Sequence, residues 1–384
     1  MIMREIQNEN EFKEWVDKAT DPVAIQGLDL RHFTKEISKA TFSSCLFLGC
    51  TLAPEATVRI VSTGGTVIPN NDKFKFTAHR KELYTVQDLF GEYDGKDIDG
   101  YFKTPDYQIY LEYNRQGKRD NKIDVSLHRR LHDHSITDAL NEVLKNRRVV
   151  AVMGGHSMER RDPFYKKTAA LSRKLTQDGF LMVSGGGPGA MEATHLGAYF
   201  ATREEHELFE AIDAFKQRPD GAKKDKEYED RDWLQRAWKI REAYPMAEAD
   251  KEACMSVGIP TWLYGHEPPA PFATHIAKYF ANSVREDGLL MIANHGIVFV
   301  PGSAGTTQEI FQDAAQNHYG TDDYYRPMIL MGKEYWWLER PVWPLLRQVS
   351  LKKKYGELVA LTDDETEIRS LLKSYDESKY KKEE

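Results

Sequence analysis

The sequence has few cysteines and no long apolar run. These features argue against a disulfide-rich protein and against a membrane-spanning one. Its three cysteines, Cys45, Cys50 and Cys254, show neither metal-ligand spacing nor an even disulfide framework, so we expect free thiols in a reducing compartment. No apolar stretch approaches the roughly 20 residues that span a bilayer, and the first residues lack the apolar centre of a signal peptide. We therefore expect a cytoplasmic protein without a membrane partner.

The composition is that of a globular protein without a strong charge bias. Hydrophobic residues make up 41% and charged residues 29% of the 384 positions, which is typical of folded domains. The chain is long enough for a large core and for more than one folded unit. Its net charge of −7 argues against an extensive nucleic-acid-binding surface. We expect no nucleic-acid partner.

The order of patterns along the chain predicts four regions. Residues 1–54 form a small N-terminal unit that could be β-rich, and residues 55–147 an irregular and helical connection. Residues 148–350 form the main domain, and residues 351–384 a C-terminal tail. Within the main domain, residues 203–250 are a highly charged insertion that we expect to be an exposed helical hairpin with a mobile tip. Its charges favour a solvated face, and a lid over the binding site is the other interpretation.

Two patterns before the main domain leave alternatives open. The apolar pairs Leu28 with Phe33 and Phe42 with Phe47 are each five residues apart, which fits either a pentapeptide-like β-solenoid fragment or ordinary strands. A tyrosine-rich run follows, which suggests irregular structure packed on another domain or subunit; it comprises Tyr84, Tyr93, Tyr101, Tyr107, Tyr110 and Tyr113.

Three histidines in a charged helical pattern raise the question of a metal site. His128 and His132 are four residues apart and would share a helix face, with His134 nearby. No third ligand follows at a recognised spacing. We expect solvated or interface histidines and no bound metal.

The most informative stretch is IVFVPGSAGTTQEIFQDAA, residues 297–315. It has the pattern of a buried strand, a glycine turn and a helix that opens at Thr306 or Thr307. The N–H groups of such a turn have no intrahelical partner, and the helix dipole adds about half a positive charge, so the turn can hold a phosphate group. Glu309 would lie in the first helical turn, where the dipole favours its ionised form.

Two earlier turns repeat the strand-glycine pattern. VVAVMGGHS ends a predicted strand in Gly154 and Gly155, and SGGGPGAM follows a predicted strand at 180–183. All three turns would lie at the carboxyl ends of parallel strands, where open α/β sheets bind ligands and glycine allows close backbone approach. The predicted binding residues are Gly154, Gly155, Ser184, Gly185, Gly186, Gly187, Gly189, Met191, Pro301, Gly302, Ser303, Ala304, Gly305, Thr306 and Thr307.

Two of these turns resemble signatures of the LOG family, the cytokinin-activating nucleoside 5′-monophosphate phosphoribohydrolases. The PGGxGTxxE signature is similar to Pro301, Gly302, Ser303, Ala304, Gly305, Thr306 and Glu309, with Ser303 where the family usually has glycine. The GGGxxGxM signature is similar to Gly185, Gly186, Gly187, Gly189 and Met191, with one residue fewer between the glycines. The resemblance covers residues 149–202 and 257–333, about a third of the chain.

Alternating strands and helices predict an α/β fold with a mostly parallel sheet. The resemblance implies a Rossmann-like arrangement with helices on both faces, beside the smaller N-terminal region. It implies hydrolysis of the N-glycosidic bond of a nucleoside 5′-monophosphate to free base and ribose 5-phosphate. Glu309 would be catalytic, and Arg285 matches the family's arginine on the helix before the PGG strand. The family also implies a homodimer and no metal or organic cofactor.

Other functions remain open at this point. Gly185, Gly187 and Ala190 fit a dinucleotide pattern, with Glu207 or Glu210 as the acidic residue, but that interpretation leaves the anion turn at Pro301 unexplained. A nucleotide-binding sensor would account for the long N-terminal portion. Amino-acid decarboxylation, suggested by an old family label, has no support, because nothing marks a lysine for pyridoxal phosphate.

Overall fold

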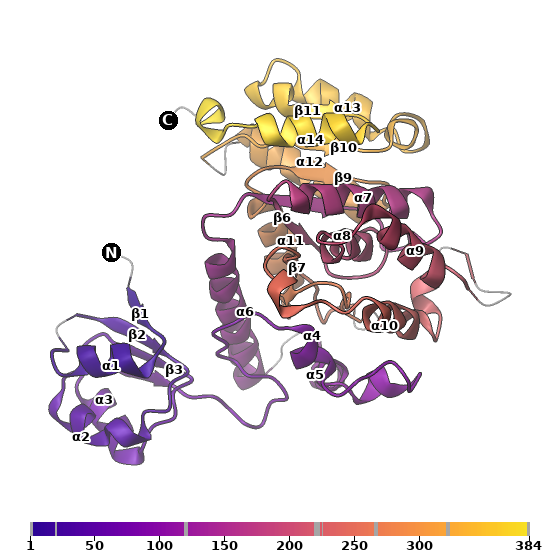
Figure 1. Cartoon of the computed structure of the whole chain (residues 1–384). Helices are drawn as coiled ribbons and strands as arrows, with labels where there is room; N and C mark the ends of the chain where they lie inside the picture. Colours follow the sequence, from indigo (N-terminus) through magenta and orange to yellow (C-terminus); the bar gives the residue numbers. More distant parts are fainter. Residues whose placement is uncertain are drawn as a thin grey trace. The chain divides into compact units, whose positions relative to one another are not determined.

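The computed structural model describes residues 3–19, 21–118, 122–218, 223–224, 226–264, 268–319 and 323–381. The chain divides into two compact units, whose elements are labelled in Figure 1. Unit 1 consists of Met1–Leu83 and Leu111–Val143, and unit 2 of Tyr84–Tyr110 and Leu144–Glu384. Each unit is therefore built from two separate stretches of the chain.

Unit 1 contains a four-stranded parallel sheet in the order β1-β2-β3-β4. Strands and helices alternate along the chain, because parallel neighbours need a crossover connection. The core includes the fully buried side chains of Ile25, Phe42 and Phe47. The elements are β1 (Arg4–Ile6), α1 (Glu9–Val16), β2 (Val23–Gln26), α2 (Thr34–Lys39), β3 (Leu46–Leu48), α3 (Pro54–Ser62) and β4 (Thr66–Ile68).

The five-residue spacing in this unit does not reflect a solenoid. Residues 26–53 contain a short 3-10 helix (Arg31–Phe33), α2 and β3. The spaced apolar side chains share one core but reach it from loops, the 3-10 helix and a strand; they are Leu28, Phe33, Phe42 and Phe47. The predicted boundary at residue 54 falls at the first residue of α3, within the unit.

Unit 2 is built on a seven-stranded parallel sheet in the order β11-β10-β9-β5-β6-β7-β8. The strand order reverses between the neighbours β5 and β9, which confirms the Rossmann-like α/β class predicted from the sequence. Every residue of β5 is buried. The strands are β5 (Val149–Met153), β6 (Leu181–Ser184), β7 (Ser256–Gly258), β8 (His275–Ile276), β9 (Ile297–Phe299), β10 (Met328–Leu330) and β11 (Val359–Leu361).

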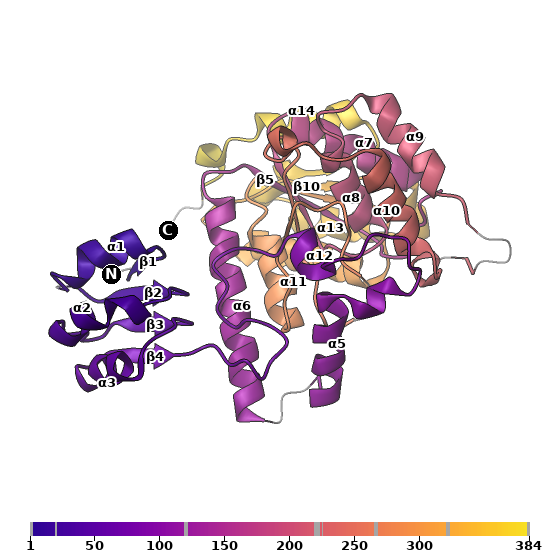
Figure 2. The same ribbon diagram turned by 60° about the horizontal axis from the view of Figure 1, so that its bottom comes forward.

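Helices cover both faces of this sheet (Figure 2). Alternate β5 residues, Val150 and Val152, pack with α7, α8 and α14 on one face, and α11 and α12 lie on the other. α7 begins where Asp162 caps the Phe164 N–H and Pro163 takes the first helical position. The helices are α7 (Pro163–Gln177), α8 (Ala190–Tyr199), α11 (Asn282–Met291), α12 (Ala304–Tyr319), α13 (Val342–Ser350) and α14 (Glu365–Ser374).

Two segments of unit 2 are more integrated than the sequence indicated. The predicted tail supplies β11 and α14, and Ile368 and Leu372 of α14 are fully buried in the core. The insertion forms α9 (Glu205–Phe215) and α10 (Trp233–Ala243), whose residues Phe215 and Ala237 enter the same core. Its helices are therefore not the exposed hairpin that we expected. Residues 219–222 and 225 of its tip lie outside the described residues.

The stretch from Tyr84 to Tyr110 packs into unit 2. It includes α4 (Val86–Phe90) and the start of α5 (Pro105–Gln116). Tyr84 and Ile276 exchange two backbone hydrogen bonds, of 3.0 and 2.7 Å. The buried carboxylate of Asp106 accepts hydrogen bonds from Trp262 Nε1 at 2.9 Å and from Lys278 Nζ at 2.6 Å. These contacts make the stretch part of the main domain.

The histidine-rich helix α6 (Ile123–Leu144) belongs mainly to unit 1. His132 is buried, with Nδ1 3.2 Å from Asp133 Oδ1, and His128 Nδ1 lies 2.7 Å from the Asp124 carbonyl oxygen. Among the described residues, no group of three or more His, Cys, Asp or Glu side chains could hold a metal ion. Nor does any helix within the described ranges have the length and apolar character to cross a membrane.

Candidate functional site

Three glycine turns meet at the carboxyl ends of β5, β6 and β9. These strands lie beside one another, and β5 and β9 flank the point where the strand order reverses. In open α/β sheets this point is where the loops diverge and leave a crevice for a ligand. The glycine turns predicted from the sequence therefore come together at the position that the sheet topology favours for binding.

Backbone hydrogen bonds join the turns to one another. The Gly155 N–H donates to the Pro301 carbonyl at 3.0 Å, and the Ala190 N–H donates to the Gly155 carbonyl at 3.1 Å. Gly189 has a φ of +70°, and a Cβ there would collide with the Gly155 carbonyl oxygen. A Cβ at Gly302 would come within 2.8 Å of the Gly155 nitrogen. These glycines pack turn against turn, whereas the sequence had suggested close approach to a ligand.

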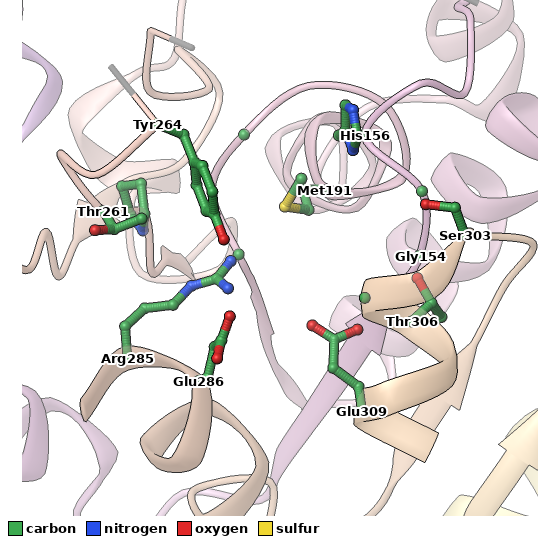
Figure 3. Close-up of a pocket in the computed structure, with 15 residues that line it drawn as sticks. Gly154, His156, Met191, Thr261, Tyr264, Arg285, Glu286, Ser303, Thr306 and Glu309 are labelled. Atoms are coloured by element: carbon green, nitrogen blue, oxygen red, sulfur yellow. The ribbon is translucent and has the colours of Figure 1, made fainter. Parts of the chain in front are cut away.

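The turns border a cavity of about 330 Å³, which is within the size range of small-molecule sites (Figure 3). Gly305 opens directly onto this space, because a Cβ at Gly305 would meet nothing within 4 Å. The predicted site residues that line the cavity are Gly154, Gly155, Gly185, Gly187, Met191, Arg285, Ser303, Gly305, Thr306 and Glu309.

The other predicted residues lie behind the lining. Ser184 is buried and its hydroxyl donates to the Val152 carbonyl at 2.7 Å. The Thr307 hydroxyl and N–H both donate to the Ser303 carbonyl at 3.1 Å. That backbone bond closes the first turn of α12, which begins at Ala304 rather than at Thr306 or Thr307 as predicted. The remaining residues behind the lining are Gly186, Gly189, Pro301, Gly302 and Ala304.

Arg285 reaches the cavity from α11. Its Nε donates to the Ile259 carbonyl at 2.9 Å, and its guanidinium group lies where a Cβ at Gly185 would be. Gly185 is therefore needed to make room for the arginine. The acidic neighbours of Arg285 have other partners, because Asn282 donates to Glu286 and Gln312 donates to Asp287.

Glu309 extends from the first turns of α12 into the same space, and its carboxyl group and the Arg285 guanidinium group both face the cavity (Figure 3). Burial raises the pKa of Glu309 to about 7, Arg285 acts to lower it, and Glu286 acts to raise it. The sequence argument considered only the helix dipole, which favours the ionised form. Burial acts in the opposite direction and has the larger effect on the pKa.

Several cavity residues were not predicted. His156 directly follows the first glycine pair, Tyr264 and Thr261 follow β7, and Pro260 and Glu286 complete the set. The insertion also approaches the site, because the Tyr228 ring lies 5.3 Å from the His156 ring. The carboxyl end of β7 could have been considered from the sequence, since it is the next strand of the same parallel sheet. The contact with the insertion had no local signal.

No protein-family model and no curated protein matches this sequence. Solved structures with a similar arrangement include the molybdenum cofactor binding protein from the phototrophic bacterium Rippkaea orientalis, with 13% identity and a TM-score of 0.37 over 60% of this chain and 98% of that chain. Another is the Moco carrier protein from Chlamydomonas reinhardtii, with 13% identity and a TM-score of 0.35 over 60% of this chain and 100% of that chain. At these identities and TM-scores, nothing about the function of this chain follows from either structure.

Proposed function

We propose that this protein hydrolyses the N-glycosidic bond of a nucleoside 5′-monophosphate and releases the free base and ribose 5-phosphate. One observation carries the proposal: a helix N-terminus, a partly buried carboxyl group and a guanidinium group face one cavity. The resemblance of the glycine turns to the LOG signatures supports it.

The substrate phosphate would bind at the start of α12. The N–H groups of a first helical turn are free to donate to an anion, and the helix dipole favours negative charge there. Ser303, Gly305 and Thr306 line the cavity at this end. Tyr264 lies on the opposite side of the cavity from Ser303, next to Arg285 (Figure 3). The base would extend toward Tyr264, which leaves the ribose beside Glu309.

The chemistry follows from the charge that develops on the sugar. Cleavage of an N-glycosidic bond builds positive charge on the ribose, as in other glycoside hydrolyses. Ionised Glu309 would stabilise this charge or accept a proton from the attacking water, whose oxygen joins C1′ while the base departs. Arg285 would orient the carboxylate and the ribose hydroxyl groups. A pKa near 7 keeps the ionised form available at neutral pH.

The experiment is chromatography of the protein after incubation with ribonucleoside and deoxyribonucleoside 5′-monophosphates. We expect the wild type to release free base, Glu309→Gln to lose turnover while it still binds nucleotide, and Arg285→Ala to lose most activity. Asp313→Asn is the matched control, because Asp313 lies one turn further along α12, also has a pKa raised to about 7 by burial, and is not part of the cavity lining. Full activity in Glu309→Gln would refute the catalytic assignment.

A nucleotide sensor is the second candidate. Unit 1 has a sheet and a core of its own, which a hydrolase built on unit 2 does not need for its chemistry. Saturable binding of a nucleotide that stays intact after long incubation would favour this function over hydrolysis.

The proposal includes a homodimer, because the resemblance implies that state, and a cytoplasmic location, which we expect from the sequence. Sedimentation velocity of the full chain would test the homodimer. A single species at the monomer mass of 44.2 kDa over a broad concentration range would contradict it.

A further inference from the structure

A short helix whose residues do not line the cavity contacts the proposed anion turn. This helix, η5 (Tyr335–Glu339), is a π-helix that follows β10. Its residue Trp336 is fully buried and donates through Nε1 to the Met331 carbonyl at 3.1 Å, which fixes η5 to the end of β10. π-helical turns are rare and often occur at functional sites.

Two side chains of this segment form a directed chain of hydrogen bonds to the turn. The Tyr335 hydroxyl donates to the Gly302 carbonyl at 2.5 Å, and Arg340 Nε donates to the Tyr335 oxygen at 3.2 Å. An arginine side chain can only donate, and a tyrosine hydroxyl has a single proton. The direction is therefore fixed from Arg340 through Tyr335 to Gly302.

The hydrogen bond to the Gly302 carbonyl is linked to the orientation of the Ser303 N–H, because both groups belong to the same peptide unit. In a trans peptide the N–H lies opposite the C=O, so the Ser303 N–H points away from the Gly302 carbonyl and from Tyr335. Ser303 lines the cavity and Tyr335 does not. An N–H group of Ser303 that points away from Tyr335 would be available to the phosphate of the proposed substrate.

We propose that Tyr335 and Arg340 are positioning residues of the anion site and set the direction and donor strength of the Ser303 amide toward a phosphate monoester. The inference rests on the proposed function, since it deepens the role of the same turn. Hydrogen bonds in series polarise one another, so the Arg340 cation strengthens the Ser303 donor without placing a charge in the cavity. The turn can then hold a phosphate without a lysine.

Calorimetry with ribose 5-phosphate and inorganic phosphate tests the role of Tyr335. Tyr335→Phe should weaken the binding of both probes by about fivefold, the usual effect of one hydrogen bond, and should shift the Ser303 amide signal in ¹H–¹⁵N spectra. Tyr375→Phe is the matched control, because the Tyr375 hydroxyl also donates to a backbone carbonyl, that of Tyr325, at 2.7 Å. It should leave probe affinity unchanged. Equal probe affinity in the wild type and Tyr335→Phe overturns the inference.

A double-mutant cycle tests the relay from Arg340. Arg340→Met should weaken phosphate binding in the wild type and have no further effect in Tyr335→Phe, because Arg340 acts through the tyrosine. Additive losses overturn the relay. Probe binding without nucleotide hydrolysis refutes the proposed reaction but supports this inference when Tyr335→Phe weakens that binding. A wild type that binds neither probe overturns this inference, whereas release of free base still decides the proposed reaction.

Discussion

At the scale of a residue, burial and favourable neighbouring charges have opposite effects on the ionisation of Glu309. It must be partly removed from water to face a sugar, and that removal raises its pKa to about 7. Arg285 and the start of α12 favour the charged form without restoring an ordinary pKa. The carboxyl group is therefore shared between its two protonation states near neutral pH, a condition suited to general acid and base chemistry.

The pKa of Glu309 predicts the pH dependence of the proposed reaction. If the ionised form is the active one, kcat/KM should rise with pH through about 7 and reach a plateau above it, because protonation removes the active form. Initial rates between pH 5.5 and 9 measure this. Asp313→Asn should keep the same inflection. A profile that falls as the pH rises through 7 would instead assign Glu309 the role of an acid.

The sequence located Glu309 but not its protonation state. Its position follows from a strand, a glycine turn and a helix within a few residues, which are local patterns. Its pKa depends on burial by residues from several strands and helices, including Arg285 and Glu286, and no local pattern reports that. His156 and Tyr335 were missed for the same reason, since their roles depend on contacts between distant segments.

At the scale of elements, the glycine turns around the cavity contain glycines with different roles. Gly302 and Gly189 are needed for contacts between turns, and Gly305 borders open space. The sequence treated these glycines alike, because a glycine-rich turn has the same composition whether its bare backbone faces a ligand or another loop. In the structure the two roles differ in the atoms that a side chain at each glycine position would contact.

Gly305→Ala should therefore separate binding from folding. Its methyl group would enter the cavity where phosphate oxygens are proposed, and we expect about tenfold weaker binding of ribose 5-phosphate in calorimetry. The free energy of unfolding should not fall, because alanine is favoured over glycine in helices by roughly 1 kcal/mol. Gly288→Ala on α11 is the matched control, since a Cβ there also meets nothing within 4 Å and it lies outside the cavity lining. Unchanged affinity in Gly305→Ala would place the phosphate elsewhere.

The element predictions succeeded where strand, turn and helix were consecutive, as at β5, β6 and β9. They failed for β11 and α14, because a three-residue strand such as Val359–Leu361 carries little periodic signal. The prediction of an exposed hairpin for the charged insertion was wrong for a different reason. Its buried residue Glu227 pairs with Arg236 and accepts a hydrogen bond from the Arg160 N–H, and burial of paired charges cannot be distinguished from a solvated face by composition.

At the scale of the whole molecule, unit 2 depends on a segment that precedes α6 in the chain. Asp106 is fully buried beside Lys278 and Trp262. Asp106→Ala would remove the carboxylate that faces a buried ammonium group, so we expect unfolding to become easier by about 3–5 kcal/mol. Urea denaturation measures this. Asp97→Ala, which removes an exposed pair with Lys103, should have a far smaller effect on the free energy of unfolding. Similar losses in both variants would contradict the structural role of Asp106.

The division into units explains why linear boundaries at 54 and 147 were a poor description. Each unit takes two stretches of chain, and the stretch from Tyr84 to Tyr110 belongs with the later sheet. Sequence patterns assign residues to elements through near neighbours, but membership of a core depends on contacts across more than a hundred positions. The α/β class could be predicted because it needs only the alternation of strands and helices.

The strand order also has a consequence for synthesis. β5 pairs with β6 on one side and with β9 on the other, but residues 297–299 leave the ribosome long after residues 149–153. In the interval the growing chain presents one edge of a wholly apolar strand, VVAVM, and such edges recruit other chains. The arrival of β9 closes this edge, and α12, which follows β9 directly, then supplies the last residues of the cavity lining.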